Sequence, residues 1–208
     1  MAIDKETFNT WNSVGKLYEE KFMHLDIYNH TYDTFLRLLP PDNASVLDIG
    51  CGPGNISRYL YNAKPGLKIS GMDMSPNMIE LAKKNIPAGS FSVLAIQEIH
   101  TLAKKYDGIV AGFCIPYLSL EEVSYLIGNI HNLISENGIF YLSFVEGDYN
   151  HSGYATASNG MRTYFHYYKP DTMAALLAKH QFKTLNIETV AYGHSPGEKH
   201  IVIISKKL

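Results

Sequence analysis

Apolar residues along this chain recur with two different periods, one typical of buried strands and one typical of helices. Short, nearly continuous apolar runs, which are typical of strands buried on both faces, occupy residues 46–49, 68–72, 91–95, 108–112 and 139–145. The segments between them have a helical period, as Val123, Leu126, Ile127 and Ile130 show. Strands that alternate with amphipathic helices predict an α/β fold with a parallel sheet and right-handed crossovers.

Two of these helices begin with recognisable capping residues. Ser75 precedes Pro76, which matches a serine N-cap followed by proline at the first helical position. Ser119 and Glu122 have the spacing of a capping box, in which each residue satisfies a backbone N–H of the other. The sequence therefore predicts helix starts at both places.

The two ends of the chain complete the pattern. Residues 7–22 and 27–39 have a helical period and precede Pro40-Pro41, where a helix cannot continue. We therefore expect residues 1–39 to form an N-terminal helical cap. The C-terminal part predicts a helix and a final hairpin, at residues 170–179, 184–192 and 200–205, with the hairpin turn at 194–197.

One segment has no clear period. Residues 146–161 are rich in Gly, Ser, Asn and Tyr, and an extended aromatic stretch follows at 162–168. Long aperiodic loops in compact domains often carry function, so we expect residues 146–170 to cover a substrate. In an extended stretch alternate side chains share a face, which would place on one side Arg162, Tyr164, His166 and Tyr168. On this interpretation Phe165 and Tyr167 point toward the core.

Length and composition limit the possible classes of protein. The 208 residues, 46% of them hydrophobic, suffice for a single domain over residues 1–208. The net charge is −2 and the Lys and Arg residues are scattered, which disfavours nucleic-acid binding. The apolar runs are too short for a membrane span and the N-terminus lacks a signal-peptide core, so we expect a cytoplasmic protein. The sequence leaves the oligomeric state open.

Cysteine and histidine usage predicts neither a disulfide framework nor a metal site. Cys51 and Cys114 are too few for such a framework in a chain of this length. The nine histidines form no H-x-H or H-x-x-x-H pair and no Cys/His cluster with the spacing of metal ligands. We therefore expect two reduced cysteines and no bound metal.

The most informative motif is Asp48-x-Gly50-x-Gly52-x-Gly54, which follows the first strand and precedes a helix. Ligands of doubly wound sheets bind at the carboxyl ends of the strands, and glycines let a ligand approach the backbone closely. Asn55 stands where a dinucleotide loop has its third glycine, and there is no G-K-[ST] sequence. Because the Asp48 carboxylate would repel a pyrophosphate, the motif favours a ligand that carries a positive charge.

This motif resembles motif I of the class I S-adenosylmethionine-dependent methyltransferases. Three further stretches resemble the family's later strands in the right order: Gly71-Met72-Asp73-Met74-Ser75, Tyr106-Asp107-Gly108-Ile109-Val110 and Asn137-Gly138-Ile139-Phe140. The resemblance covers residues 46–144. It implies a doubly wound, mostly parallel seven-stranded sheet of the Rossmann-like methyltransferase type, with an antiparallel last strand. It also implies in-line methyl transfer from S-adenosylmethionine, and we expect the acceptor to be a small molecule.

The resemblance assigns cofactor-binding roles to several residues. The loop residues Gly50, Cys51, Gly52 and Gly54 form the methionine side, where Asp48 faces the ammonium group. Asp73 holds the ribose diol, for which a carboxylate offers two acceptors, and Met74 either packs on the adenine or makes an ordinary core contact. Ala95 stands where many members have an aspartate. The backbone N–H of Ile96 and the side chain of Gln97 are therefore expected to make the hydrogen bonds to the adenine. The remaining contacts come from the backbone of Phe113 and from Tyr18 in the N-terminal cap.

The acceptor side is less defined. Pro116-Tyr117 stand where many relatives have two histidines, which leaves Tyr117 as a weak candidate for a general base facing the methyl group. His166 is the better base because its ordinary pKa lies near neutrality. Arg162 is the better anchor for an acceptor carboxylate or phosphate. The acceptor and its accepting atom stay open.

Two other functions remain as alternatives. A non-enzymatic S-adenosylmethionine-binding regulatory protein would keep the cofactor residues without an acceptor pocket above the sulfonium. A nicotinamide-dependent oxidoreductase is disfavoured by Asn55 and Asp48.

Overall fold

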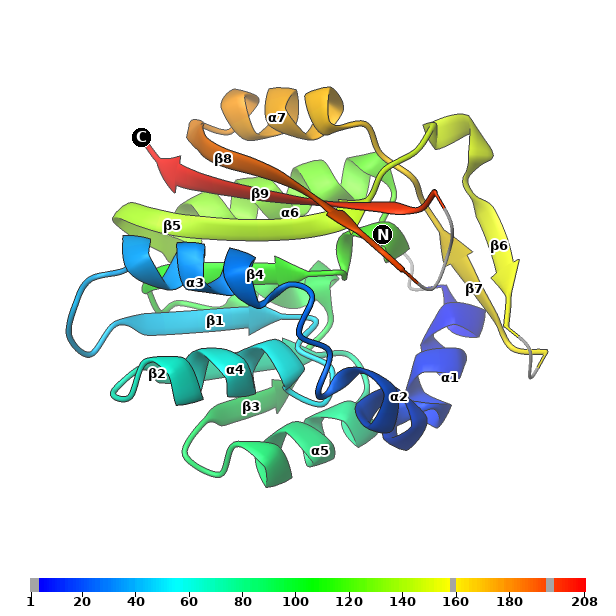
Figure 1. Cartoon of the computed structure of the whole chain (residues 1–208), viewed down its shortest axis with the longest axis horizontal. Coiled ribbons are helices and arrows are strands. Elements are labelled where there is room, and N and C mark those ends of the chain that lie inside the picture. Colours follow the sequence, from blue (N-terminus) through cyan, green and yellow to red (C-terminus); the bar gives the residue numbers. More distant parts are fainter. Residues whose placement is uncertain (1–3, 158–159, 194–196) are drawn as a thin grey trace.

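The computed structural model of the chain describes residues 4–157, 160–193 and 197–208. A seven-stranded sheet runs through its centre in the order β3-β2-β1-β4-β5-β9-β8 (Figure 1). Its strands are β1 (Ser45–Ile49), β2 (Lys68–Asp73), β3 (Ser90–Val93), β4 (Tyr106–Gly112), β5 (Ile134–Val145), β8 (Phe182–Ala191) and β9 (Lys199–Lys207). Strand β9 runs antiparallel to both of its neighbours, β5 and β8, and all other adjacent strands of this sheet are parallel. The doubly wound sheet with an antiparallel last strand is thereby confirmed.

Helices cover both faces of the sheet. One face carries α3 (Asn29–Leu38), α4 (Asn55–Ala63) and α5 (Pro76–Asn85), and the other carries α6 (Leu120–Leu133) and α7 (Pro170–Lys179) (Figure 1). Each face has its own apolar core. Phe35 and Leu60 belong to the first core, and Ile127 and Met173 belong to the second. Burial on both faces explains why the central strands are continuous apolar runs.

The predicted helix starts are confirmed in detail. The hydroxyl of Ser75 accepts a hydrogen bond from the N–H of Met78 at 3.2 Å, with Pro76 at the first helical position. Ser119 and Glu122 make both halves of a capping box, at 3.3 Å and 2.9 Å. These contacts join residues three positions apart, which is why the sequence alone predicts them.

The N-terminal cap differs from the prediction in one respect. The expected helix at 7–22 is two helices, α1 (Lys5–Ser13) and α2 (Gly15–Phe22), separated at Val14. A Cβ atom built on Gly15 would lie 3.3 Å from Cδ1 of Leu81 in α5. The break occurs where α2 begins to pack closely against α5, a contact that no local period reveals.

The expected loop at 146–161 contains a strand. β6 (Gly153–Thr156) pairs antiparallel with β7 (Arg162–Phe165) in a separate two-stranded ribbon. The prediction that Phe165 and Tyr167 point toward the core is wrong, because both are only partly buried whereas Tyr168 is 1% exposed. The alternation breaks because β7 ends at Phe165 and Tyr168 instead forms a bridge to Glu146. The predicted turn at 194–197 lies largely outside the described residues.

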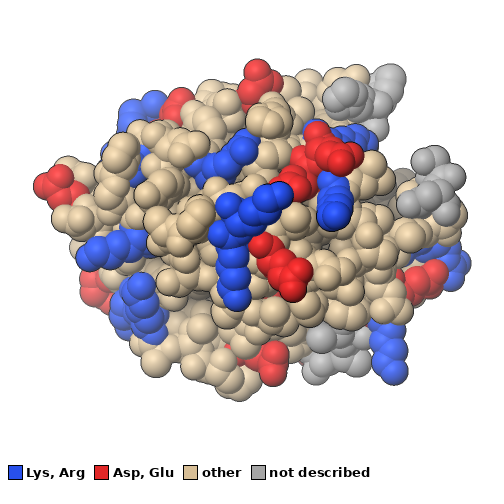
Figure 2. All heavy atoms as spheres, turned by 90° about the horizontal axis from the view of Figure 1, so that it is seen from below, with Lys and Arg blue, Asp and Glu red and all other residues tan. Residues whose placement is uncertain are grey.

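The carboxyl ends of the parallel strands meet α1, α2 and the β6–β7 ribbon at one end of the sheet (Figure 1). The chain order reverses here between β1 and β4, the place where doubly wound sheets bind ligands. On the face that Figure 2 shows, Lys and Arg are interspersed with Asp and Glu among uncharged residues. None of the helices in the described ranges has the length and apolar character that a membrane crossing requires.

Candidate functional site

The glycine loop after β1 depends on left-handed backbone conformations. Gly50, Gly52 and Gly54 have φ angles of 64°, 54° and 85°, which side chains disfavour. A Cβ atom on Gly50 would lie 2.7 Å from the Cβ of Cys114, and one on Gly54 would lie 2.6 Å from Cδ1 of Ile86. The left-handed backbone therefore favours glycine at both positions, and the contact with Cys114 adds a steric requirement at Gly50.

A cavity of about 230 Å³, here called the glycine-loop cavity, lies at this end of the sheet. Eight residues that the sequence predicted for a cofactor line it: Tyr18, Gly50, Gly52, Asp73, Met74, Ile96, Gln97 and Phe113. They come from α2, the glycine loop and the segments that follow β2, β3 and β4. The fold thus brings together residues that are widely separated in the chain.

Asp73 lies at the end of β2 with its carboxylate held by backbone donors. Oδ2 accepts from the N–H of Gly52 at 3.0 Å, and Oδ1 accepts from the N–H of Ser75 at 2.8 Å. Burial raises the pKa of this carboxyl, and the two backbone hydrogen bonds oppose that change. Each carboxylate oxygen has a further lone pair, so the group remains able to accept hydrogen bonds from a ligand in the cavity.

Two buried ring nitrogens in the cavity wall lack partners. Nε1 of Trp11 and Nδ1 of His166 make no hydrogen bond to any described residue, and both side chains line the glycine-loop cavity. A buried polar group without a partner is costly, so a polar ligand would stabilise these groups. Together with the Asp73 acceptors and the glycine backbone, they fit a ligand with the donors and acceptors of S-adenosylmethionine.

Three predicted cofactor residues, Asp48, Cys51 and Gly54, do not line this cavity. Asp48 is 1% exposed and accepts a hydrogen bond from the Ser57 hydroxyl at 2.7 Å. Burial raises the pKa of its carboxyl to about 7. Gly54 caps α4, and Cys51 is buried, with its N–H donating to the carbonyl of Met72 at 3.0 Å. The structure therefore places these residues in support of the loop.

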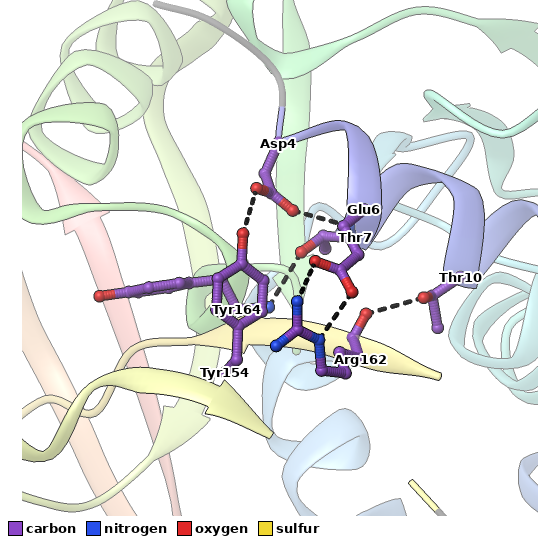
Figure 3. A network of polar contacts seen from close by, with 7 residues as sticks. All are labelled: Asp4, Glu6, Thr7, Thr10, Tyr154, Arg162 and Tyr164. Atoms are coloured by element: carbon purple, nitrogen blue, oxygen red, sulfur yellow. Dashed lines mark hydrogen bonds and ion pairs between the residues drawn. The ribbon is translucent and has the colours of Figure 1, made fainter. Parts of the chain in front are cut away.

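Helix α1 is tied to strand β7, and residues of both elements line the glycine-loop cavity. Figure 3 shows the contacts, which involve Asp4, Glu6, Thr7, Thr10, Tyr154, Arg162 and Tyr164. Arg162 forms a bidentate ion pair with Glu6 at 2.7 Å and 2.9 Å, and its carbonyl accepts from the Thr10 hydroxyl at 2.7 Å. Thr7 accepts from the N–H of Tyr164 at 2.9 Å. We call this set of contacts the α1–β7 latch; it holds α1 as one wall of the glycine-loop cavity.

Weakening the latch should speed the loss of a ligand from beneath α1. In Glu6→Gln, which removes the charge from the bidentate pair, we expect dissociation of S-adenosylhomocysteine to be a few-fold faster. Stopped-flow fluorescence of Trp11, the single tryptophan, would measure the rate. Glu136→Gln is the matched control, because it removes an ion pair with Lys207 that involves neither cavity. An unchanged rate in Glu6→Gln would show that α1 does not limit release.

A second and larger cavity of about 610 Å³ adjoins the first. We call it the aromatic cavity, because Phe, Tyr and Trp side chains from several distant elements form much of its wall. Trp11, Tyr18, Phe113 and Tyr117 line both cavities. Its volume lies within the range of about 300–1,000 Å³ that is usual for small-molecule sites.

The residues predicted for the acceptor are separated by the structure. Tyr117 lies between the two cavities, but burial raises its pKa, and its hydroxyl makes no hydrogen bond to a described base that could take its proton, so the phenol by itself is a poor base. His166 lines only the glycine-loop cavity, where burial lowers its pKa. Arg162 lies in the latch and lines neither cavity, so the structure gives no support to its predicted role as an acceptor anchor.

Sequence reasoning missed a polar group in the aromatic cavity. The Tyr28 hydroxyl lies 2.5 Å from Nδ1 of His200, and Nε2 of the same imidazole lies 2.7 Å from Oε1 of Glu198. All three residues line the cavity. Tyr28 and His200 are 172 positions apart, so no spacing in the sequence signals their contact. Among the described residues, no three His, Cys, Asp or Glu side chains are grouped so as to hold a metal ion.

Comparison with known sequences places the chain among methyltransferases. Residues 23–187 match the family model described as a methyltransferase domain. A putative methyltransferase of invertebrate iridescent virus 6 is 30% identical over 70% of this chain and 52% of its own length. A carboxy-S-adenosyl-L-methionine synthase of Campylobacter concisus is 28% identical over 57% of this chain and 51% of its own. The chain thus spans about half the length of these curated relatives.

Solved structures share the fold at lower identity. Magnesium protoporphyrin IX methyltransferase from Synechocystis, with bound S-adenosylmethionine, has a TM-score of 0.72 at 18% identity, covering 100% of this chain and 99% of that one. A 1,6-didemethyltoxoflavin-N1-methyltransferase from Burkholderia thailandensis has a TM-score of 0.68 at 18% identity, and the match covers 100% of this chain and 91% of that one. Because the matching family model extends over well more than half of the sequence, the chain belongs to the methyltransferase domain family.

Proposed function

We propose that this protein is an S-adenosylmethionine-dependent methyltransferase that acts on a small-molecule acceptor by in-line transfer. The observation that carries the proposal is the convergence of eight predicted cofactor residues on one cavity around Asp73. Two of the similar structures are named for small-molecule substrates, magnesium protoporphyrin IX and 1,6-didemethyltoxoflavin. The adjoining aromatic cavity supports a substrate of that size.

When bound, S-adenosylmethionine supplies a methyl group activated by a positively charged sulfur. The chain's own residues bind and orient it. Asp73 accepts hydrogen bonds from the ribose diol, while Gly50 and Gly52 let the backbone approach the methionine part. The rings of Tyr18 and Tyr117 stand where the two cavities meet, where they favour a cationic centre by cation–π contact. Trp11 of helix α1 also lines both cavities here.

The adenine end is the part where this chain departs from many relatives. Gln97 lines the glycine-loop cavity, and its side-chain amide donates to Oε1 of Glu122 at 3.2 Å. With its amide nitrogen engaged by Glu122, Gln97 keeps its amide oxygen as the acceptor that we assign to the adenine amino group. His166, whose Nδ1 has no partner among the described residues, offers a further contact at the same cavity.

The non-enzymatic alternative predicts a cofactor site without room for an acceptor. Here a cavity of about 610 Å³ shares four wall residues with the glycine-loop cavity, which favours catalysis over simple sensing. The oxidoreductase alternative requires a pyrophosphate on the helix after the loop. The buried Asp48 carboxyl behind that loop disfavours a diphosphate.

A thermal-shift titration tests the cofactor assignment. Ligand at 100 times its dissociation constant stabilises a protein by about 2.7 kcal/mol. For a domain of this size, S-adenosylhomocysteine should therefore raise the melting temperature by roughly 5–10 °C. NAD at the same concentration is the control and should leave it unchanged. A shift with NAD and none with S-adenosylhomocysteine would overturn the proposed function.

A further inference from the structure

The wall of the aromatic cavity is suited to a ligand that contains an aromatic ring system. Ten of the described side chains in its wall are Phe, Tyr or Trp. Phe113 stands at its border with the glycine-loop cavity, with its ring centroid 4.9 Å from that of Tyr28 and 5.0 Å from that of His200. Aromatic rings pack on one another in offset or edge-to-face arrangements, so such a wall favours an aromatic ligand.

The charges around the cavity disfavour an anionic ligand. The wall includes two carboxylates, Asp26 and Glu198, and one guanidinium, that of Arg58. Arg58 is already engaged, because it donates to the carbonyl of Met23 at 2.9 Å. Recognition of a carboxylate or phosphate commonly uses an available arginine fork, which this wall does not present among its described residues. The chemistry of the wall therefore disfavours a negatively charged ligand.

A group of three hydrogen-bonded polar side chains interrupts the aromatic wall. Tyr28 and His200 are 5% and 6% exposed. The Glu198 carboxylate contacts Nε2 of the imidazole, the ring nitrogen that does not face Tyr28. Since a carboxylate accepts only, it fixes the proton on Nε2 and leaves Nδ1 as the acceptor for the Tyr28 hydroxyl. Tyr28 consequently presents its oxygen lone pairs as the acceptor for a further donor. We call these three residues the Tyr28–His200–Glu198 relay.

We propose that the aromatic cavity binds a flat aromatic acceptor that carries a hydroxyl group and no negative charge, and that the relay removes the proton of this hydroxyl. This inference rests on the proposed function and adds to it the substrate class and the proton-accepting residues. Tyr28 is the group that touches the acceptor, and Glu198 is a positioning residue that acts through His200.

Protons and electrons balance in this step. The acceptor's hydroxyl proton passes to the Tyr28 oxygen while the Tyr28 proton passes to Nδ1 of His200. The electron pair of the O–H bond stays on the acceptor oxygen and forms its bond to the methyl carbon, as the pair of the carbon–sulfur bond returns to sulfur. The imidazolium that results is paired with the Glu198 carboxylate.

Three naphthalene probes separate the parts of this inference. 2-Naphthol has the ring and the hydroxyl, 2-methoxynaphthalene has the ring without the donor, and 2-naphthoate carries a negative charge. Binding of each probe to protein saturated with S-adenosylhomocysteine would be measured by the quenching of the fluorescence of Trp11, which lines the cavity. We expect 2-naphthol to bind about tenfold more tightly than the other two, the ratio that about 1.4 kcal/mol represents.

Variants then test the relay. Tyr28→Phe should abolish the preference for 2-naphthol over 2-methoxynaphthalene, and Glu198→Gln should reduce it. Tyr141→Phe is the matched control for the first, because it removes a buried hydroxyl that lies 3.1 Å from the Thr31 hydroxyl outside both cavities. Glu188→Gln is the control for the second, because it alters a Glu–His pair with His30 outside both cavities. Both controls should keep the preference.

The outcomes distinguish the parts of the proposal. Equal binding of 2-naphthol and 2-methoxynaphthalene by the unaltered protein would overturn the relay, as would a preference that survives Tyr28→Phe. Tighter binding of 2-naphthoate than of 2-naphthol would overturn the inference that the acceptor carries no negative charge. If protein that binds S-adenosylhomocysteine bound none of the probes, the inference of an aromatic acceptor would be overturned. Failure to bind S-adenosylhomocysteine would instead overturn the proposed function. Formation of 2-methoxynaphthalene from 2-naphthol and S-adenosylmethionine, slowed in Glu198→Gln, would extend the support to the reaction.

Discussion

Replacing Asp73 with alanine should weaken the binding of S-adenosylhomocysteine at least a hundredfold. Asp73 lines the glycine-loop cavity and is the acceptor that we assign to the ribose diol. Hydrogen bonds to a charged group are each worth about 1.5–3 kcal/mol, so losing two costs about 3–6 kcal/mol, and about 1.4 kcal/mol corresponds to a factor of ten. The N–H of Gly52 also loses its acceptor, which loosens the loop around the same ligand.

Isothermal titration calorimetry would measure this loss, with circular dichroism to show that the variant is folded. Asp107→Ala is the matched control. Oδ2 of Asp107 likewise accepts two hydrogen bonds, from the N–H and the hydroxyl of Ser45 at 2.8 Å and 2.9 Å, but the residue lines neither cavity. Equal affinity in Asp73→Ala and the unaltered protein would show that the ribose is held elsewhere.

Replacing Asp48 with asparagine should stabilise the ligand-free protein at neutral and higher pH. Burial raises the pKa of this carboxyl from an ordinary value of 3.8 to about 7. The folded protein therefore binds more protons than the unfolded chain between these values, and stability falls as the pH rises through this window. This pKa difference corresponds to roughly 4 kcal/mol in the free energy of unfolding. That stability is fully present below about pH 4 and is lost above about pH 7. The amide of the variant cannot ionise, so the variant would not show this loss.

Urea unfolding at a series of pH values would measure the effect. The advantage of Asp48→Asn should be largest near pH 8 and should disappear near pH 4. Ser57→Ala should act in the opposite direction, because the Ser57 hydroxyl donates to Asp48 and favours its ionised form. Curves for Asp48→Asn and the unaltered protein that run parallel across the range would show that Asp48 does not titrate in this window.

Features that depend on neighbours in the chain were predictable from the sequence. The capping residues Ser75 and Ser119 act on backbone groups three positions away, and the glycine loop needs backbone conformations that only glycine adopts easily. The buried parallel strands are visible as apolar runs because both of their faces are covered. From these local signals, and from the resemblance they carry, the sheet, its antiparallel last strand and most of the residues around Asp73 could be predicted.

Features that depend on contacts between distant segments were decided only by the tertiary structure. The charge of Arg162 alone suited it to an acceptor anion, yet Glu6, 156 positions away, pairs with it in the latch. His200 belongs to an apolar strand. It becomes part of the Tyr28–His200–Glu198 relay only because β9 lies beside β5 and brings the imidazole into contact with Tyr28. The burial of Tyr168 could not follow from alternation, since the strand before it ends at Phe165. The sequence determined the glycine loop, because local backbone chemistry selects glycine there, and through the resemblance that this loop carries it predicted most of the residues around the glycine-loop cavity. The packing of distant elements determined which residues line the aromatic cavity.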